Sequence, residues 1–225
     1  MYNFLLIDID DTILNFRDHA EDIIRESAAH FGIAFGDEEF AVYHRVNGPL
    51  WEAVGEGRLS REGLYAIRWA RVLEALNIEG DGPAVEAEFR RRLNECAIPE
   101  HGAPEALAAL AKRFTLATAS NAPQRQQELR LAKAGLTPYF THIFTSQGIG
   151  ADKPSPTFYE RCLENLGNPD RRTVLMVGDD PAADVRGAAA CGLDTCFVNN
   201  RGKTLPADCH PTFTVSDLAD LPALL

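Results

Sequence analysis

Hydrophobic residues follow three different patterns along the chain. Residues 4–7 form a short apolar run between polar residues, which is typical of a buried strand. From about residue 15 to about residue 100, apolar residues recur at helical spacing without any strand pattern. From about residue 101 to the end, short apolar runs alternate with helical segments. The chain therefore predicts one strand, then a helical stretch, then an alternation of strands and helices.

The helical stretch predicts a series of consecutive helices. The first spans 17–31 and the second begins at Asp37. The third runs from a cap at Ser60 to about residue 76, and the fourth spans 84–96. Gly32 suits the end of the first helix, and acidic residues open the second, where the helix dipole favours them. This stretch is expected to form an all-helical cap domain.

The last part predicts strands over 114–119, 139–145, 174–177, 195–198 and 213–215, with helices over 123–134, 156–166 and 181–190. Strands that alternate with helices form right-handed βαβ units and a parallel sheet, which the first strand is expected to join. The predicted fold class is α/β, a doubly wound parallel sheet with an inserted helical cap. The predicted domains are a core of residues 1–14 and 101–225 and a cap of residues 15–100.

Composition and charge restrict the possible partners. The 225 residues are 45% hydrophobic and 24% charged, which is ordinary for a globular protein. The net charge of −11, from 33 acidic and 22 basic residues, disfavours a nucleic-acid polymer as partner and makes a divalent cation more plausible for an anionic substrate. No apolar run approaches the roughly 18–20 residues of a membrane span, and no signal peptide is expected. The pattern leaves the oligomeric state open.

The cysteines indicate a reducing environment. There are 5 of them, an odd number, and they show no CxxC spacing. A zinc site or a disulfide framework is therefore not expected, and a cytoplasmic location with buried thiols is.

Polar residues gather where the predicted strands end. Asp8 and Asp10 follow the first strand, and the period-two alternation of strand side chains would point them the same way. Ser120 and Asp179 follow later strands, and Lys153 precedes a helix that begins with proline. The carboxyl ends of parallel strands meet at one edge of a sheet, where ligands bind. Crowded carboxylates there require a cation, a proton or a reaction.

Three of the predicted helices share one starting device. Pro123, Pro156 and Pro181 stand where the first helical residue is expected, and proline costs nothing there because its missing N–H would have no partner. Ser155 and Asp180 are the expected N-caps of the second and third helices.

Together these residues resemble the four motifs of the haloacid dehalogenase-like hydrolases, a phosphotransferase superfamily. The motifs are Asp8-Ile9-Asp10-Asp11-Thr12, then Ser120-Asn121, then Lys153 before Pro154, and finally Gly178-Asp179-Asp180 with Asp184. Each motif alone has a simpler explanation as a turn, a cap or a surface lysine. All four in order, at the ends of predicted strands, indicate the family, and the helical stretch matches the cap that the family inserts after its first motif.

The resemblance implies a Rossmann-like core and a reaction through an aspartyl-phosphate. Asp8 would attack phosphorus, and Asp10 would protonate the leaving oxygen and later activate water. The implied cofactor is Mg²⁺, held by Asp8, the backbone carbonyl of Asp10 and Asp179. Ser120, the backbone around Asn121, and Lys153 would bind the phosphate. Supporting roles fall to Thr12, Asp180 and Asp184.

Asp10 narrows the reaction further. The dehalogenases proper lack an acid at that position, since a halide leaves without a proton, so Asp10 argues for a phosphate ester. Phosphonate cleavage uses a cap lysine, yet residues 15–100 contain none. A sugar phosphomutase would need cap residues that we do not identify in this sequence.

The cap sequence resembles that of the pyrimidine 5′-nucleotidases that act on non-standard nucleotides. A base would need an apolar surface and a few polar groups. The candidates for these contacts are Asn15, Phe16, Asn47, Trp51 and Arg68, with Trp69 as a further aromatic residue. The competing interpretation of the tryptophans is that they pack the cap. Two other functions stay open, a phosphatase of sugar or other small metabolite phosphates and a non-catalytic scaffold.

Overall fold

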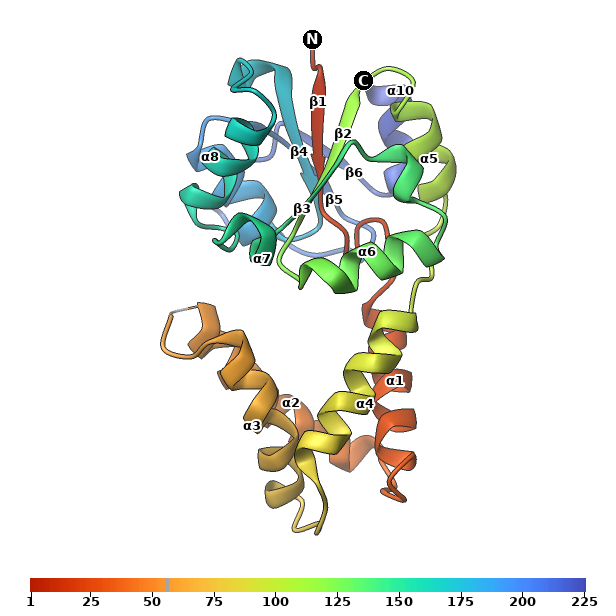
Figure 1. The fold of residues 1–225 in the computed structure, drawn as a ribbon. Coiled ribbons are helices and arrows are strands. Elements are labelled where there is room, and N and C mark those ends of the chain that lie inside the picture. Colours follow the sequence, from red (N-terminus) through yellow and green to blue (C-terminus); the bar gives the residue numbers. More distant parts are fainter. Residues whose placement is uncertain (56) are drawn as a thin grey trace. The chain divides into compact units, whose positions relative to one another are not determined.

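The computed structural model describes residues 1–55 and 57–225. They form two compact units, one of residues 1–16 and 97–225 and one of residues 17–96. The first unit carries a six-stranded sheet and the second is built from helices (Figure 1). Within the described residues, no helix combines the length and the apolar character that crossing a membrane would require.

The sheet unit is a parallel sheet with strand order β3-β2-β1-β4-β5-β6. Its strands are β1 (Phe4–Ile7), β2 (Thr115–Ser120), β3 (His142–Thr145), β4 (Val174–Gly178), β5 (Asp194–Val198) and β6 (Phe213–Val215). Its helices are α5 (Ala103–Leu110), α6 (Gln124–Lys133), α7 (Ser146–Ile149), α8 (Pro156–Asn165), α9 (Gly187–Ala190) and α10 (Leu221–Leu224). The α/β class and the parallel sheet predicted from the sequence are confirmed.

Helices cover both faces of this sheet because its central strand is apolar on both sides. Leu5 and Ile7 of β1 pack into one core with Leu107 of α5, and Leu6 packs into the opposite core with Phe158 of α8. Helices α5 and α8 accordingly lie on opposite sides of the strands in Figure 1. An apolar run buried on both faces is the expected signature of a strand in a doubly wound sheet.

The helical unit contains α1 (Arg17–Ala29), α2 (Asp37–Gly55), α3 (Arg61–Ala75) and α4 (Gly82–Glu95). Trp69 of α3 is fully buried and lies against the rings of Phe35, Tyr43 and Phe89. Helices α3 and α4 come very close at Gly82, where a Cβ would lie 2.4 Å from the backbone nitrogen of Ala70. An aromatic core and one close helix crossing therefore hold this unit together.

The chain leaves and re-enters the sheet unit through a short antiparallel pairing. The backbone N–H of Asn15 donates to Ile98 O at 2.8 Å, and the N–H of Glu100 donates to Ile13 O at 3.0 Å. Leu14 and Pro99 form the bridge between these two bonds. The two connections to the helical unit are thus held side by side.

Some element boundaries differ from the prediction. The strand predicted over 139–145 begins only at His142, because Thr137–Tyr139 is a 3₁₀ turn. The helix predicted over 181–190 is a π-helical turn, Pro181–Arg186, followed by α9. Pro123 is the N-cap of α6 and not its first residue, since its ψ of 143° is extended. Helix α5 was not predicted, and its N-cap is Gly102 in the left-handed region, which offers no capping side chain to recognise.

Candidate active site

The three central strands bring three functional side chains to one edge of the sheet. Ile7, the last residue of β1, pairs with Thr118 of β2 and Val177 of β4. Asp8 follows directly, and its backbone N–H donates to Val177 O at 2.9 Å. Ser120 and Asp179 stand at the ends of the two neighbouring strands. Strand order reverses around β1, and this switch point is where open α/β sheets bind ligands.

Lys153 joins two buried carboxylates. Its Nζ donates to Asp8 Oδ1 at 2.7 Å and to Asp184 Oδ1 at 2.6 Å, and all three residues are buried. Burial by itself lowers the pKa of Lys153, but the negative charges of Asp184 and Asp8 outweigh it and raise that pKa above its usual value. Lys153 is therefore a permanent cation beside Asp8.

The carboxylates of Asp8, Asp179 and Asp184 form a tight group. They offer oxygen atoms that lie within 4.8 Å of one another. Thr12 Oγ1 lies 3.3 Å from Asp8 Oδ2 and 3.5 Å from Asp179 Oδ1, so it links two of them. Sequence-predicted Asp8, Asp179, Asp184 and Thr12 are all brought together here.

This group fits a hard divalent cation. Burial raises the pKa of Asp8 well above its usual value, although Lys153 opposes the shift. Burial likewise raises the pKa of Asp179, opposed by a hydrogen bond from Lys203. Such a cluster needs further positive charge to stay ionised, and several carboxylate oxygens are the donor set that Mg²⁺ prefers. The described residues therefore suit the magnesium site implied by the sequence.

Asp180 and Asp184 turn out to have different local roles. Asp184 Oδ2 accepts from the backbone N–H of Asp180 at 3.0 Å, which fixes it beside Lys153. It passes so close to β4 that a Cβ on Gly178 would lie 2.2 Å from the same oxygen. Asp180 Oδ1 instead accepts from the N–H groups of Ala182 and Ala183. Asp180 is thus the predicted helix cap, and its carboxylate is engaged at the start of the π-helical turn.

Ser120 is placed to donate its hydroxyl hydrogen. Its Oγ accepts from the backbone N–H of Ala122 at 3.2 Å and from Gln127 Nε2 at 2.9 Å. A hydroxyl has two acceptor lone pairs and one hydrogen. The two bonds occupy the acceptors and leave the hydrogen as the group that can bind a phosphoryl oxygen.

The Asp10 carboxylate is bound to helix α6. Strand β1 ends at Ile7, so the strand alternation used to predict the direction of Asp10 does not extend to it. Asp10 Oδ2 accepts from Gln127 Nε2 at 2.8 Å, and Oδ1 accepts from Arg130 Nη1 at 2.5 Å. Gln127 and Arg130 were missed because they look like ordinary positions of a polar helix. Their i, i+3 spacing places them on one face of the helix but does not indicate what that face contacts.

Lys203 is a further residue that the sequence did not indicate. Its Nζ donates to the backbone oxygen of Asp179 at 2.9 Å and to Asp179 Oδ2 at 2.5 Å. It lies in a loop after β5, outside all four motifs, so only the folded chain brings it to the site.

The candidate substrate residues require one clear correction. Arg68 is only 4% exposed and forms a buried ion pair with Glu86, with Nη2 at 2.6 Å from Oε1. Its Nη1 also donates to Asn47 Oδ1 at 3.4 Å. Arg68 is therefore a structural residue of the helical unit and is not accessible to a substrate. Trp69 packs the core as well, whereas Trp51 is 37% exposed.

The two candidates in the sheet unit lie near its loops. Asn15 Oδ1 accepts from Arg201 Nη2 at 3.2 Å. The backbone N–H of Phe16 donates to Asp11 Oδ1 at 3.1 Å, and the Arg130 guanidinium lies 5.9 Å from the centre of the Phe16 ring.

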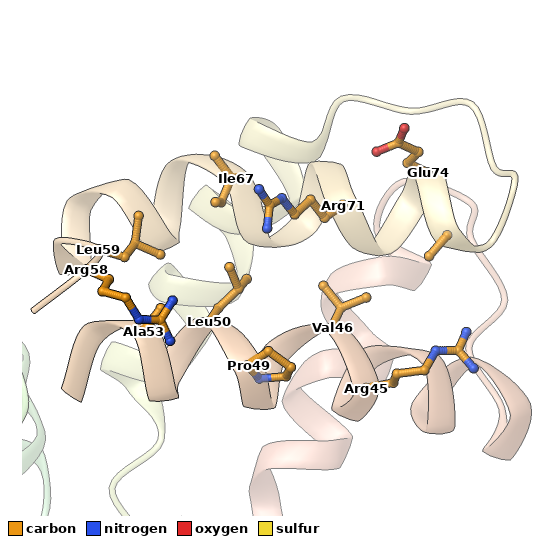
Figure 2. Close-up of a pocket in the computed structure, with 11 residues that line it drawn as sticks. Arg45, Val46, Pro49, Leu50, Ala53, Arg58, Leu59, Ile67, Arg71 and Glu74 are labelled. Atoms are coloured by element: carbon orange, nitrogen blue, oxygen red, sulfur yellow. The ribbon is translucent and has the colours of Figure 1, made fainter. Parts of the chain in front are cut away.

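A separate groove of about 640 Å³ lies within the helical unit, between α2 and α3 (Figure 2). Apolar side chains such as Leu50, Leu59 and Ile67 line it, together with Arg45 and Arg71. The residues of the carboxylate group do not line this groove.

The architecture and these motifs agree with one known family, whose model matches residues 2–192 and is described as a haloacid dehalogenase-like hydrolase. The chain belongs to the haloacid dehalogenase-like hydrolases. The family resemblance inferred from the four motifs is thereby confirmed, and the chain is a hydrolase of this family.

Similar proteins cover the whole length of this hydrolase. It is 32% identical to the pyrimidine 5′-nucleotidase YjjG of Escherichia coli, over 100% of this chain and 98% of YjjG. It is 30% identical to the pyrimidine 5′-nucleotidase PynA of Streptococcus pneumoniae, over 98% of this chain and 93% of PynA. The crystal structure of the HAD-hydrolase YfnB from Bacillus subtilis, described as bound to magnesium, superposes with a TM-score of 0.91 at 31% identity, covering 100% of this chain and 98% of YfnB.

Proposed function

We propose that this chain is a Mg²⁺-dependent phosphomonoester hydrolase that acts through an aspartyl-phosphate on Asp8, with pyrimidine 5′-nucleotides as its substrates. The observation that carries the proposal is the buried contact of Lys153 with Asp8, inside a group of carboxylates suited to a divalent cation. The substrate class rests on the similarity to YjjG and PynA.

In the first step, a carboxylate oxygen of Asp8 forms a bond to phosphorus while the ester P–O bond breaks. Asp10, in its protonated form, gives that proton to the leaving oxygen. Lys153 and the Ser120 hydroxyl neutralise and orient the phosphoryl oxygens, because phosphoryl transfer depends mainly on positioning and electrostatics. When bound, Mg²⁺ would be held by Asp8, Asp179 and the backbone carbonyl of Asp10, and it would supply positive charge to the transferring phosphoryl group.

In the second step, Asp10 takes a proton from water, and the water oxygen attacks phosphorus. The bond from phosphorus to Asp8 breaks, which releases inorganic phosphate and restores the Asp8 carboxylate. Asp184 and Thr12 act through neighbouring residues: Asp184 orients Lys153, and Thr12 contacts both Asp8 and Asp179.

A panel of phosphate esters with and without Mg²⁺ tests the proposal. We expect Mg²⁺-dependent phosphate release, highest for pyrimidine nucleoside monophosphates, and no turnover by Asp8→Asn. That variant should stay folded, as circular dichroism would show, because its amide can still accept from Lys153. Higher turnover of sugar phosphates would overturn the substrate class alone. Normal turnover by Asp8→Asn, or no activity on any ester, would overturn the mechanism.

A further inference from the structure

Helix α6 places two fully buried polar side chains beneath Asp10. Gln127 and Arg130 are both 0% exposed. Burying a guanidinium is expensive unless a negative charge accompanies it. The partner here is the Asp10 carboxylate, whose own side chain is 30% exposed. The buried cation is therefore directed at a carboxylate that solvent can also reach.

The two side chains hold both oxygens of Asp10 and also hold each other. Arg130 Nη1 contacts Asp10 Oδ1 at 2.5 Å, and Gln127 Nε2 contacts Oδ2 at 2.8 Å. Arg130 Nη1 also donates to Gln127 Oε1 at 3.0 Å. Because each of the three groups is bonded to the other two, the plane of the Asp10 carboxylate is set by the helix.

The same amide connects this arrangement to Ser120. Gln127 Nε2 donates to Ser120 Oγ at 2.9 Å as well as to Asp10. Under the proposed function, Ser120 binds a phosphoryl oxygen and Asp10 exchanges a proton with the ester oxygen. One buried amide thus fixes the spacing between the two.

We propose that Arg130 and Gln127 are positioning residues that orient the Asp10 carboxyl toward the leaving oxygen of the ester, a role that rests on the proposed function. The competing interpretation is purely structural, a link between the loop after β1 and helix α6. The two differ in one measurable way. A positioning role matters only when the leaving group needs a proton, whereas a structural role affects all substrates alike.

Three probes separate these roles, namely 4-nitrophenyl, phenyl and benzyl phosphate. Nitrophenolate can leave without receiving a proton, whereas the benzyl alkoxide needs a proton in order to leave. The quantity to compare is kcat/KM, which stops at phosphorylation of Asp8 and is not affected by the later hydrolysis. For Arg130→Met and Gln127→Leu we expect kcat/KM on benzyl phosphate to fall on the order of 100-fold, the scale of lost proton transfer, and on 4-nitrophenyl phosphate only a few-fold.

Further variants show how large a loss of kcat/KM to expect. Asp10→Asn gives the response of an enzyme without the proton donor, and Arg130→Lys, which keeps one cationic donor, should fall between Arg130→Met and the wild type. Arg125→Met is the matched control, because Arg125 is on the same helix with a side chain 76% exposed. For each variant, the ratio of kcat/KM on benzyl phosphate to kcat/KM on 4-nitrophenyl phosphate does not depend on how much of the preparation is folded. If Arg130→Met yields no folded protein, Gln127→Leu decides.

An equal loss on all three esters in Arg130→Met and Gln127→Leu, or no loss, would overturn the positioning role while the hydrolase itself stands. An Asp10→Asn variant that treats the three esters alike would overturn it too. The proposed function fails by a different result, namely a wild-type protein that hydrolyses none of the three esters with Mg²⁺.

Discussion

The side-chain amide of Asn121 holds the main chain of Lys153 by both of its polar groups. Asn121 Nδ2 donates to Lys153 O at 2.9 Å, and Asn121 Oδ1 accepts from the Lys153 N–H at 2.8 Å. Residues 32 positions apart are thereby tied together. The second and third motifs are thus physically connected, and the ammonium group of Lys153 reaches Asp8 from a fixed backbone.

Asn121→Ala should lower both activity and stability, because Lys153 loses this support. Two hydrogen bonds of about 0.5–1.5 kcal/mol each predict a loss of about 1–3 kcal/mol in the free energy of unfolding. A displaced ammonium group predicts a roughly 10- to 100-fold lower kcat. Urea unfolding and kinetics with 4-nitrophenyl phosphate measure the two effects. Asn165→Ala is the control, since the Asn165 amide donates to Arg161 O within its own helix α8. An unchanged kcat in Asn121→Ala would contradict this account.

Mg²⁺ should stabilise the fold more strongly as pH rises. Burial raises the pKa of Asp8 and of Asp184, so above the ordinary pKa of a carboxyl the folded, metal-free protein holds more protons at these groups than the unfolded chain does. Stability from these groups is present below their ordinary pKa of about 3.9 and is lost as pH rises through the raised values.

A divalent cation replaces those protons and reverses the loss. We expect the difference in Tm between samples with Mg²⁺ and with EDTA to increase from about pH 5 to about pH 8. Asp8→Asn removes one of the carboxylates and should reduce that increase. A Tm difference that is independent of pH in the wild type would contradict the prediction.

Arg68→Met should destabilise the helical unit by about 3–5 kcal/mol, because it leaves Glu86 buried without its cation. Burial already raises the pKa of Glu86, and the hydrogen bond from Arg68 is what opposes that shift. Arg68→Met/Glu86→Leu should recover most of the loss, since an apolar pair carries no buried charge. Thermal unfolding measures both.

The matched control is the exposed pair of Arg172 and Asp170, with side chains 87% and 49% exposed. Arg172→Met should leave the Tm almost unchanged, because an exposed ion pair contributes little to stability. A change in KM without a change in Tm for Arg68→Met would restore Arg68 as a substrate residue.

The buried thiols should resist alkylation near pH 8. Burial raises the pKa of Cys162 and of Cys196 to about 12, so few of these thiols are ionised at that pH. Iodoacetamide should modify the half-buried Cys96 first. Mass spectrometry of the native protein over time gives the order, and the denatured protein is the control. Rapid modification of Cys162 would show that the fold opens around it. The cytoplasmic location inferred from the cysteines stays a prediction.

Residues at strand ends could be predicted because their position follows from local pattern. Asp8, Ser120 and Asp179 each come directly after an apolar run, and parallel strands end at a common edge. Lys153 was identified by its motif, and the helix that follows it was predicted from its proline. These placements need only the strand order and not the packing of particular side chains.

The residues that were missed or misassigned depend on packing. Gln127 and Arg130 are buried because α6 turns one face toward the loop after β1, and a polar helix does not reveal which face that is. Arg68 was mistaken for a substrate contact since its partner Glu86 lies on another helix. Lys203 reaches Asp179 from a loop of no regular pattern. A rule based on spacing along one element cannot detect contacts between elements.

The paired connections at Asn15 and Ile98 bring together the two chain segments that lead into and out of the helical unit. Both chain crossings lie within one ladder, with bonds of 2.8 and 3.0 Å, and Leu14 and Pro99 bridge at its centre. A short turn that joined the two strands of this ladder directly could take the place of residues 17–96 without altering the ends of any strand in the sheet. The inserted segment can therefore be exchanged as one unit while the residues at the strand ends stay where they are.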